Sequence, residues 1–185
     1  VKGMIPGDNI LVTDHMHQHF HVPEANLGMI TRPCHAEEIA LERLSYLTIG
    51  CKDTANATEW KKLFDTPYVR TTPSNDMKGL EYASVMKNIY AIAAGMCTSL
   101  RYGDNFQAVL LTNAMHEIVR FTKAVSDIPR DITDRGYLGD VLVTAYSNFS
   151  RNRQFGQMIG MGYSVKAAQT EMEMVAEGYY GTKAI

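Results

Sequence analysis

The chain has 185 residues, of which 45% are hydrophobic and 21% charged, and its formal net charge is −2. This length and composition allow the buried core of one domain, or of one domain and part of a second. The nearly neutral balance gives no sign of a nucleic-acid partner or an anionic membrane. The longest apolar stretch, near residues 89–95, is far shorter than the roughly 20 residues that span a bilayer.

Three cysteines, Cys34, Cys51 and Cys97, lack the CxxC spacing of a zinc knuckle. An odd number of cysteines also argues against a disulfide framework. We therefore expect a reducing compartment, the cytoplasm, for this protein.

The first part of the chain alternates short strands with helices. The sequence predicts strands at 26–31, 47–51 and 68–72, and helices at 8–20, 35–43 and 55–64. Alternation of this kind is typical of an α/β unit, here the closing elements of a doubly wound sheet. The opening residues read as the end of a strand, so we expect the sequence to be cut from a longer chain.

From Lys78 onward the hydrophobic pattern changes to the period of a helix. Apolar residues recur at i, i+3, i+4 and i+7, as in Val85, Ile89, Ile92 and Met96. The sequence therefore predicts an all-helical second part, with breaks at 102–104, 126–137 and 160–164.

Lys87 is the most unusual charged residue of this second part. It stands with Asn88 in a helical stretch of mostly apolar and small residues, and no acid lies three or four positions away to form a helical ion pair. Burial, or a second cation nearby, lowers the pKa of a lysine towards neutrality, which suits a general acid/base. The alternative is a lysine whose stem covers apolar surface while its ammonium reaches water.

A second polar group follows Gly139. Asp140 and Thr144 are four residues apart and share one face of a helix. Ser150, Arg151 and Asn152 then offer a hydroxyl, a guanidinium and an amide at the predicted start of another helix, a combination that suits a phosphate. The alternative is an N-cap serine followed by solvated polar residues.

A third group contains four histidines, at positions 15, 17, 19 and 21. On a helix, His15 lies near His19 and His17 near His21, the spacing of a metal-chelating pair. No acidic or cysteine partner stands at a matching spacing, so we predict a solvated helix face and no metal site.

Eight short motifs occur along the chain in a fixed order. They begin at Lys2, Pro33, Asp76, Lys87, Gly103, Gly139, Ser150 and Glu177. Their order and spacing resemble those of bacterial NAD(P)-dependent glycerol-3-phosphate dehydrogenases, and the resemblance covers essentially the whole chain.

The resemblance implies a mainly α fold in two domains. Residues 1–76 would be the C-terminal remnant of a Rossmann-type nucleotide-binding α/β domain, and residues 77–185 an all-helical substrate-binding and catalytic domain. No Gly-x-Gly-x-x-Gly turn follows a strand here, since the sequence around Gly160 and Gly162 lacks the third glycine. The Gly-rich turn of the family would lie upstream of Val1, and we do not expect this chain to hold a dinucleotide alone.

The resemblance also implies roles for individual residues. Lys87 matches the catalytic lysine, which exchanges the proton of the C2 hydroxyl while a hydride passes between C2 and the nicotinamide of NAD or NADP. The residues matched to substrate binding are Lys2, Cys34, Asn88, Asp140, Thr144, Ser150, Arg151 and Asn152. The residues matched to the cofactor are Ala36, Arg151, Val175 and Glu177.

Several of these matches carry more detail. Asp140 and Thr144 would position the lysine, and Arg151 and Asn152 would bind the phosphate. Lys2 would lower the pKa of the catalytic lysine if the two approach. Cys34 stands where the family commonly has a serine.

Two residues depart from the pattern. Arg32 replaces a common glycine beside the substrate loop, and Asn113 replaces a common arginine. The expected reaction interconverts sn-glycerol 3-phosphate and dihydroxyacetone phosphate, in a cytoplasmic enzyme that is commonly a homodimer in this family. Two alternatives stay open: a related dehydrogenase acting on a 2-hydroxy acid or sugar acid, and a non-catalytic dimerisation module.

Overall fold

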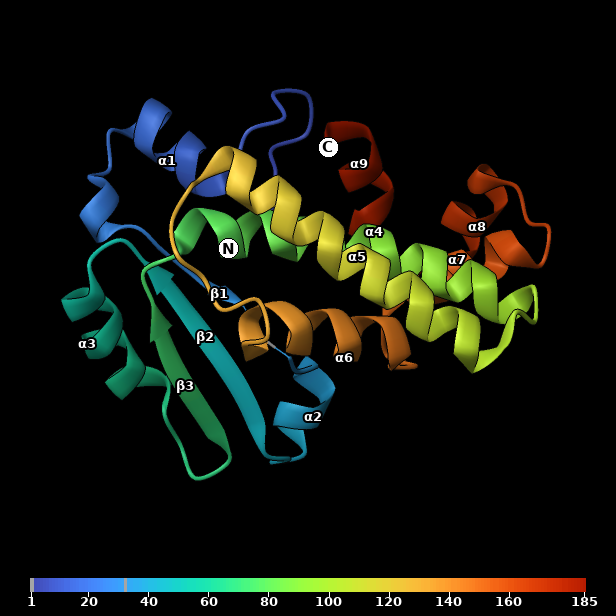
Figure 1. Cartoon of the computed structure of the whole chain (residues 1–185), viewed down its shortest axis with the longest axis horizontal. Coiled ribbons are helices and arrows are strands. Elements are labelled where there is room, and N and C mark those ends of the chain that lie inside the picture. Colours follow the sequence, from blue (N-terminus) through green and yellow to red (C-terminus); the bar gives the residue numbers. More distant parts are fainter. Residues whose placement is uncertain (1, 32) are drawn as a thin grey trace.

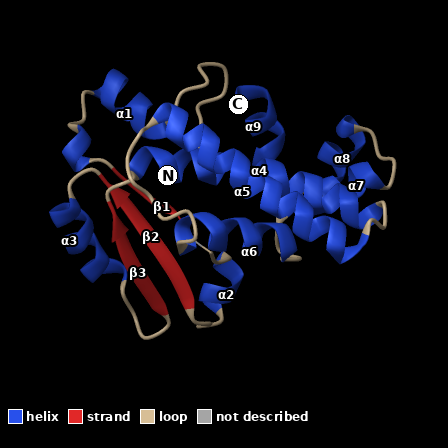
Figure 2. Cartoon of the chain, in the orientation of Figure 1, coloured by secondary structure: helices blue, strands red, loops and turns tan. Residues whose placement is uncertain are grey.

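The structure is a computed structural model that describes residues 2–31 and 33–185. A small sheet with short helices forms one end of the molecule, and longer helices extend away from it (Figure 1). The fold is mainly helical, as predicted (Figure 2). No helix of the described residues combines the length and the apolar character that a bilayer-spanning segment needs.

The first part contains the alternating elements that the sequence predicts. In order they are α1 Val12–Phe20, the 3₁₀ turn η1 Glu24–Asn26, β1 Gly28–Thr31, α2 Ala36–Ala40, β2 Ser45–Cys51, α3 Thr54–Phe64 and β3 Val69–Ser74. The first helix begins at Val12 rather than at residue 8. Residues 3–11 form a hairpin-like turn instead, in which Met4 pairs with Leu11 and Asn9 has a φ of 54°.

The sheet has the order β1-β2-β3 and mixed strand directions. β2 and β3 are parallel, whereas β1 runs antiparallel to β2, with Ile30 opposite Ile49. The 11-residue α3 returns the chain across the sheet and so permits a parallel pair, which the five-residue α2 does not do. The predicted doubly wound unit therefore has one antiparallel edge strand.

The second part is all helical, as predicted, and it breaks at or next to the three predicted stretches and also at 147–150 and 172–176. Its elements are α4 Met77–Ser99, α5 Gly103–Val125, the π-helix η2 Arg135–Gly139, α6 Asp140–Tyr146, α7 Arg151–Gly160, α8 Val165–Glu171 and α9 Glu177–Ala184. The π-helix is the one type of element here that the sequence does not predict. The division of the chain into two domains at residue 76 stays a prediction.

Helix α4 is the centre of the molecule. It contacts α5, α6, α7 and α9, and its first turns pack on the sheet, where Met77 and Leu80 join Met29 in one apolar core. A helix surrounded in this way is apolar on most of its faces, which explains why the pattern of α4 is not that of a surface helix. The polar side chains of Glu81, Ser84 and Lys87 on α4 therefore stand in the protein interior.

Two glycines bring α4 and α7 unusually close. A Cβ atom at Gly95 would lie 2.0 Å from the carbonyl oxygen of Arg153, and one at Gly156 would lie 2.0 Å from that of Ile92. No side chain fits at either position without a shift of the backbone. The start of α7, which carries Arg151 and Asn152, is therefore held firmly against the helix that carries Lys87.

Candidate active site

Asp140 is the hub of a buried charged cluster. It is the first residue of α6 and 2% exposed. Its Oδ1 accepts a hydrogen bond from Lys87 Nζ at 2.5 Å, and its Oδ2 accepts one from Thr31 Oγ1 at 2.8 Å. Lys2 Nζ lies 3.7 Å from the same Oδ2. Residues from the N-terminal segment, β1, α4 and α6 thus meet at one carboxylate.

Lys87 is buried in the middle of α4 and fixed by two partners. Besides the bond to Asp140, its Nζ donates to Thr144 Oγ1 at 3.1 Å. The Thr144 hydroxyl in turn donates to the carbonyl oxygen of Asp140 at 2.6 Å. The lysine is therefore not a side chain that reaches out to water, and its acidic partner comes from a different helix, 53 residues along the chain.

The cluster has an excess of positive charge. Burial raises the pKa of Asp140, but the charges of Lys87 and Lys2 and the hydrogen bonds from Lys87 and Thr31 lower it more, so that it lies below the usual 3.8. The carboxyl is therefore ionised at neutral pH. One carboxylate beside two ammonium groups leaves a local net charge that attracts an anion.

Ser150, Arg151 and Asn152 open helix α7, as predicted. Ser150 is its N-cap and accepts a hydrogen bond from the backbone N–H of Arg153 at 3.3 Å. Asn152 is buried, and its Oδ1 accepts from the backbone N–H of Gly178 at 2.8 Å, which ties α7 to α9. The N-cap interpretation is therefore correct for Ser150, whereas Asn152 is not a solvated residue.

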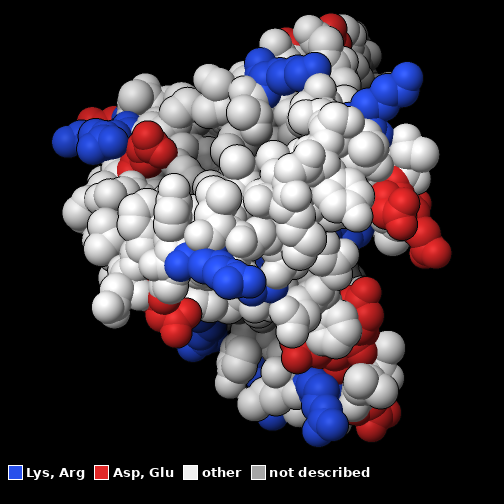
Figure 3. Space-filling view, turned by 90° about the vertical axis from the view of Figure 1, so that its right-hand side faces the viewer, with Lys and Arg blue, Asp and Glu red and all other residues white. Residues whose placement is uncertain are grey.

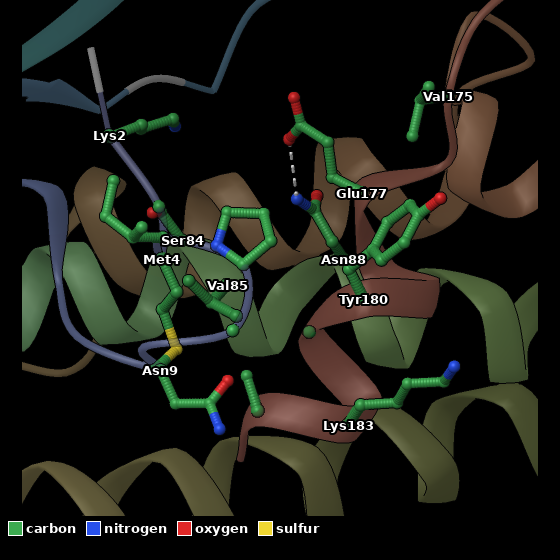
Figure 4. Close-up of a pocket in the computed structure, with 16 residues that line it drawn as sticks. Lys2, Met4, Asn9, Ser84, Val85, Asn88, Val175, Glu177, Tyr180 and Lys183 are labelled. Atoms are coloured by element: carbon green, nitrogen blue, oxygen red, sulfur yellow. Dashed lines mark hydrogen bonds between the residues drawn. The ribbon is translucent and has the colours of Figure 1, made fainter.

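A cavity of about 460 Å³ lies beside this cluster, between the N-terminal segment, α4 and α9 (Figure 4). Four of the predicted site residues line it: Lys2, Asn88, Val175 and Glu177. Asn88 Nδ2 donates to Glu177 Oε2 at 3.3 Å across the cavity wall. Residues matched to the substrate and to the cofactor by sequence thus share one hollow.

The sequence and the fold of the chain match those of known proteins. A family model described as the C-terminus of NAD-dependent glycerol-3-phosphate dehydrogenase matches residues 76–185. The chain belongs to this dehydrogenase family.

Its relatives include the glycerol-3-phosphate dehydrogenases [NAD(P)+] of Syntrophomonas wolfei, 36% identical over 158 residues, and of Desulfotalea psychrophila, 38% identical over 157 residues. Each match covers 85% of this chain and 46% of the relative. The chain therefore spans about half the length of these curated relatives.

Solved dehydrogenases have the same fold. The glycerol-3-phosphate dehydrogenase of Coxiella burnetii has a TM-score of 0.81 at 29% identity, covering 85% of this chain and 48% of that one. The enzyme of Dunaliella salina has a TM-score of 0.87 at 23% identity, covering 99% of this chain and 33% of that one, and shares the fold alone.

Three further residues matched to the dehydrogenase site, Cys34, Ala36 and Arg151, do not line the cavity. Cys34 is buried beside Leu47 and Val69, and Ala36 is exposed in the first turn of α2. Arg151 Nη1 lies 3.6 Å from Met174 Sδ, on the segment before α9. The roles of all the matched residues, whether inside or outside the cluster, stay predictions.

The structure describes one of the two residues that depart from the dehydrogenase pattern. Arg32 falls outside the described residues. Asn113 is exposed on α5. On α1 the rings of His15 and His19 are 4.3 Å apart, and the described part of the chain holds no group of three or more side chains able to bind a metal.

Sequence reasoning missed two polar residues of this region. Thr31, fully buried at the end of β1, binds Asp140 directly. Glu81, fully buried in α4, binds the N-terminal segment next to Lys2. Glu81 belongs to one of the eight motifs, but its contact with Gly3 joins positions 78 residues apart. A periodic pattern reports neighbours on one element and cannot report such a contact.

Proposed function

We propose that this chain is the catalytic half of an enzyme that interconverts sn-glycerol 3-phosphate and dihydroxyacetone phosphate. The observation that carries the proposal is the buried Lys87, held by Asp140 and Thr144 beside a second lysine, Lys2. This arrangement combines a proton-transfer group with a local positive charge for an anionic substrate, and family membership supports the same reaction.

Lys87 is proposed to exchange the proton of the C2 oxygen. In the direction of reduction, its ammonium donates a proton to the C2 oxygen of the ketone, and in oxidation its amine takes the proton from the C2 hydroxyl. Asp140 and Thr144 fix the Nζ of Lys87 in position, so that the proton passes between the C2 oxygen and an amine that is already oriented. Asn88 is the neighbouring substrate-binding residue.

The phosphate is proposed to bind through Lys2, Ser150, Arg151 and Asn152. Three of them stand at the start of α7, where free backbone N–H groups favour an anion. Binding the phosphate away from the reacting carbon would hold C2 in place. Cys34 remains a proposed substrate contact on the resemblance alone.

NAD or NADP is the proposed hydride carrier, and it supplies or accepts the hydride at C2 when bound. The residues proposed to contact it are Ala36, Arg151, Val175 and Glu177. The cavity is the proposed place for one end of such a cofactor, because Val175 and Glu177 line it and Asn88 and Glu177 are hydrogen-bonded to each other there. The chain has no Gly-rich turn for the pyrophosphate, so the rest of the cofactor needs a nucleotide-binding half.

The setting of the enzyme is proposed on the same grounds. We expect it in the cytoplasm, as the odd number of cysteines favours, and as a homodimer, as the resemblance implies. Positive and negative side chains are interspersed over the face of the molecule in Figure 3.

The test is a comparison of substrates with this chain joined to a nucleotide-binding half. Oxidation of NADH and NADPH is followed with dihydroxyacetone phosphate, with dihydroxyacetone, which lacks the phosphate, and with a small 2-oxo acid. We expect turnover with dihydroxyacetone phosphate and a kcat/KM at least about a hundredfold lower without the phosphate. Preferred turnover of the 2-oxo acid would favour the hydroxy-acid alternative, and no turnover in a folded protein would favour the dimerisation module.

A further inference from the structure

Glu81 is a fully buried acid that the proposed mechanism does not use. It lies in α4, six residues before Lys87. Its Oε1 accepts a hydrogen bond from the backbone N–H of Gly3 at 3.3 Å, and its Oε2 accepts one from the Thr13 hydroxyl. Burial of an acid is unfavourable unless its oxygens are hydrogen-bonded, so these two contacts account for how the interior tolerates it.

The contact with Gly3 fixes the backbone on which Lys2 stands. Gly3 has a φ of 121°, in the left-handed region that favours glycine. Its carbonyl oxygen accepts from the N–H of Val12 at 3.0 Å, so both polar backbone groups of Gly3 are bound. The segment around Lys2 and Met4 lies beside α4 in Figure 4.

The positions of both lysines of the Asp140 cluster therefore depend on helix α4. Lys87 is a residue of α4, and Lys2 is attached to the same helix through Gly3 and Glu81. Each lysine then meets a different oxygen of Asp140, Nζ of Lys87 at Oδ1 and Nζ of Lys2 at Oδ2. A displacement of the Gly3 backbone would move Lys2 without moving Lys87.

We propose that Glu81 is a positioning residue that holds Lys2 at the substrate site through the backbone of Gly3. The inference rests on the proposed function, because it assigns the position of a substrate-binding lysine. Burial raises the pKa of the Glu81 carboxyl, while its bonds to Thr13 and Gly3 lower it, and the net direction is upward. A protonated Glu81 still has a carbonyl oxygen for the Gly3 N–H, so the contact does not depend on its charge.

The first experiment is a double-mutant cycle in the chain joined to a nucleotide-binding half. Glu81→Leu removes the acceptor at similar size, Glu81→Gln keeps a carbonyl oxygen, and Lys2→Met removes the ammonium. We expect Glu81→Leu to raise the KM for dihydroxyacetone phosphate about tenfold in the parent but less than about twofold in the Lys2→Met background, as for two coupled sites. Glu81→Gln, which keeps the acceptor, should have a KM for dihydroxyacetone phosphate close to that of the parent.

The matched control is Asp76→Asn. Asp76 is also a buried acid, which caps α4 and binds Arg130 and the Tyr137 hydroxyl rather than the N-terminal segment. Its effect on KM should be the same with and without Lys2. If the effects of Glu81→Leu and Lys2→Met simply multiply, as for Asp76→Asn, Glu81 has only a structural role and the proposal is wrong.

A second measurement does not depend on activity. Acetylation of Lys2 Nζ is followed by mass spectrometry against Lys52, whose side chain is 67% exposed. We expect Glu81→Leu to speed labelling of Lys2 relative to Lys52, with no such change in Asp76→Asn. Unchanged labelling would overturn the proposal. If the parent enzyme fails to turn over dihydroxyacetone phosphate, the proposed function fails, and labelling still decides whether Glu81 positions Lys2.

Discussion

The carboxylate of Asp140 lies between two lysines, and its negative charge therefore matters more to the site than that of any other single residue. Lys87 and Lys2 each approach a different oxygen, and Thr31 completes the set. Removing the charge leaves two partly or fully buried ammonium groups without a counter-ion, which is a more severe change than the loss of one hydrogen bond.

We expect Asp140→Asn to lower the free energy of unfolding at pH 7 by about 3–5 kcal/mol. Because the pKa of Asp140 is lowered on folding, its stabilising effect is complete above the usual value of 3.8 and is lost as the pH falls through the lower folded value. Urea unfolding of both proteins between pH 3 and pH 7 measures the difference. A difference that stays constant below pH 3.8 would contradict the assignment.

Thr144 offers a test of how Lys87 is held. Thr144→Val removes the acceptor for Nζ, and we expect kcat to fall about tenfold, the equivalent of 1.4 kcal/mol. The matched control is Thr122→Val, since Thr122 is buried in α5 and makes the same i−4 bond, 2.6 Å to the Ile118 carbonyl oxygen. Both substitutions should change the free energy of unfolding alike. An equal loss of kcat in both variants would show that the hydroxyl of Thr144 does not act through Lys87.

At the scale of elements, α4 and the short π-helix η2 place the site. α4 carries Lys87 and Asn88 and is covered by α5, α6, α7 and α9. The π-helix ends at Gly139, so that Asp140 begins α6 directly after it. Single π-turns are found frequently at functional sites.

Because α4 and α7 pack closely, adding one methyl group between them should lower the free energy of unfolding strongly. Gly95→Ala places a Cβ 2.0 Å from the Arg153 carbonyl oxygen, and we expect the free energy of unfolding to fall by about 1–3 kcal/mol or more. In the control Gly139→Ala, the nearest atoms belong to Pro33 at 3.5 Å and φ is −59°, so the change should stay within about 1 kcal/mol. Thermal unfolding of the two variants measures the difference. Equal losses of unfolding free energy would contradict the packing argument.

Local patterns in the sequence predict the elements but not their partners. The helical period predicts the all-helical second part, and it is clearest in α5, whose buried residues recur three or four positions apart. The antiparallel direction of β1 is not predictable in this way, since a strand pattern carries no information on the neighbour's direction. A five-residue π-helix is also too short to leave a periodic signal.

At the scale of the whole molecule, the site depends on contacts between distant segments. The Lys87–Asp140 and Gly3–Glu81 contacts join positions 53 and 78 residues apart. The first was expected only through the family resemblance and the second was not expected at all. The sequence thus indicates which residues carry chemistry, whereas the fold decides which of them meet: Lys2 joins the cluster, and Asn88 meets Glu177 at the cavity.

The central claim, that Lys87 transfers the proton, is tested most directly by Lys87→Met in the chain joined to a nucleotide-binding half. The control is Lys78→Met, which removes a lysine of the same helix that pairs with Asp14 at 3.0 Å, outside the Asp140 cluster. The measurement is the rate of NADH oxidation with saturating dihydroxyacetone phosphate. We expect kcat to fall by about a hundredfold or more for Lys87→Met, as general acid–base catalysis requires, and to change little for Lys78→Met. A Lys87→Met enzyme with nearly the parent kcat would contradict the account.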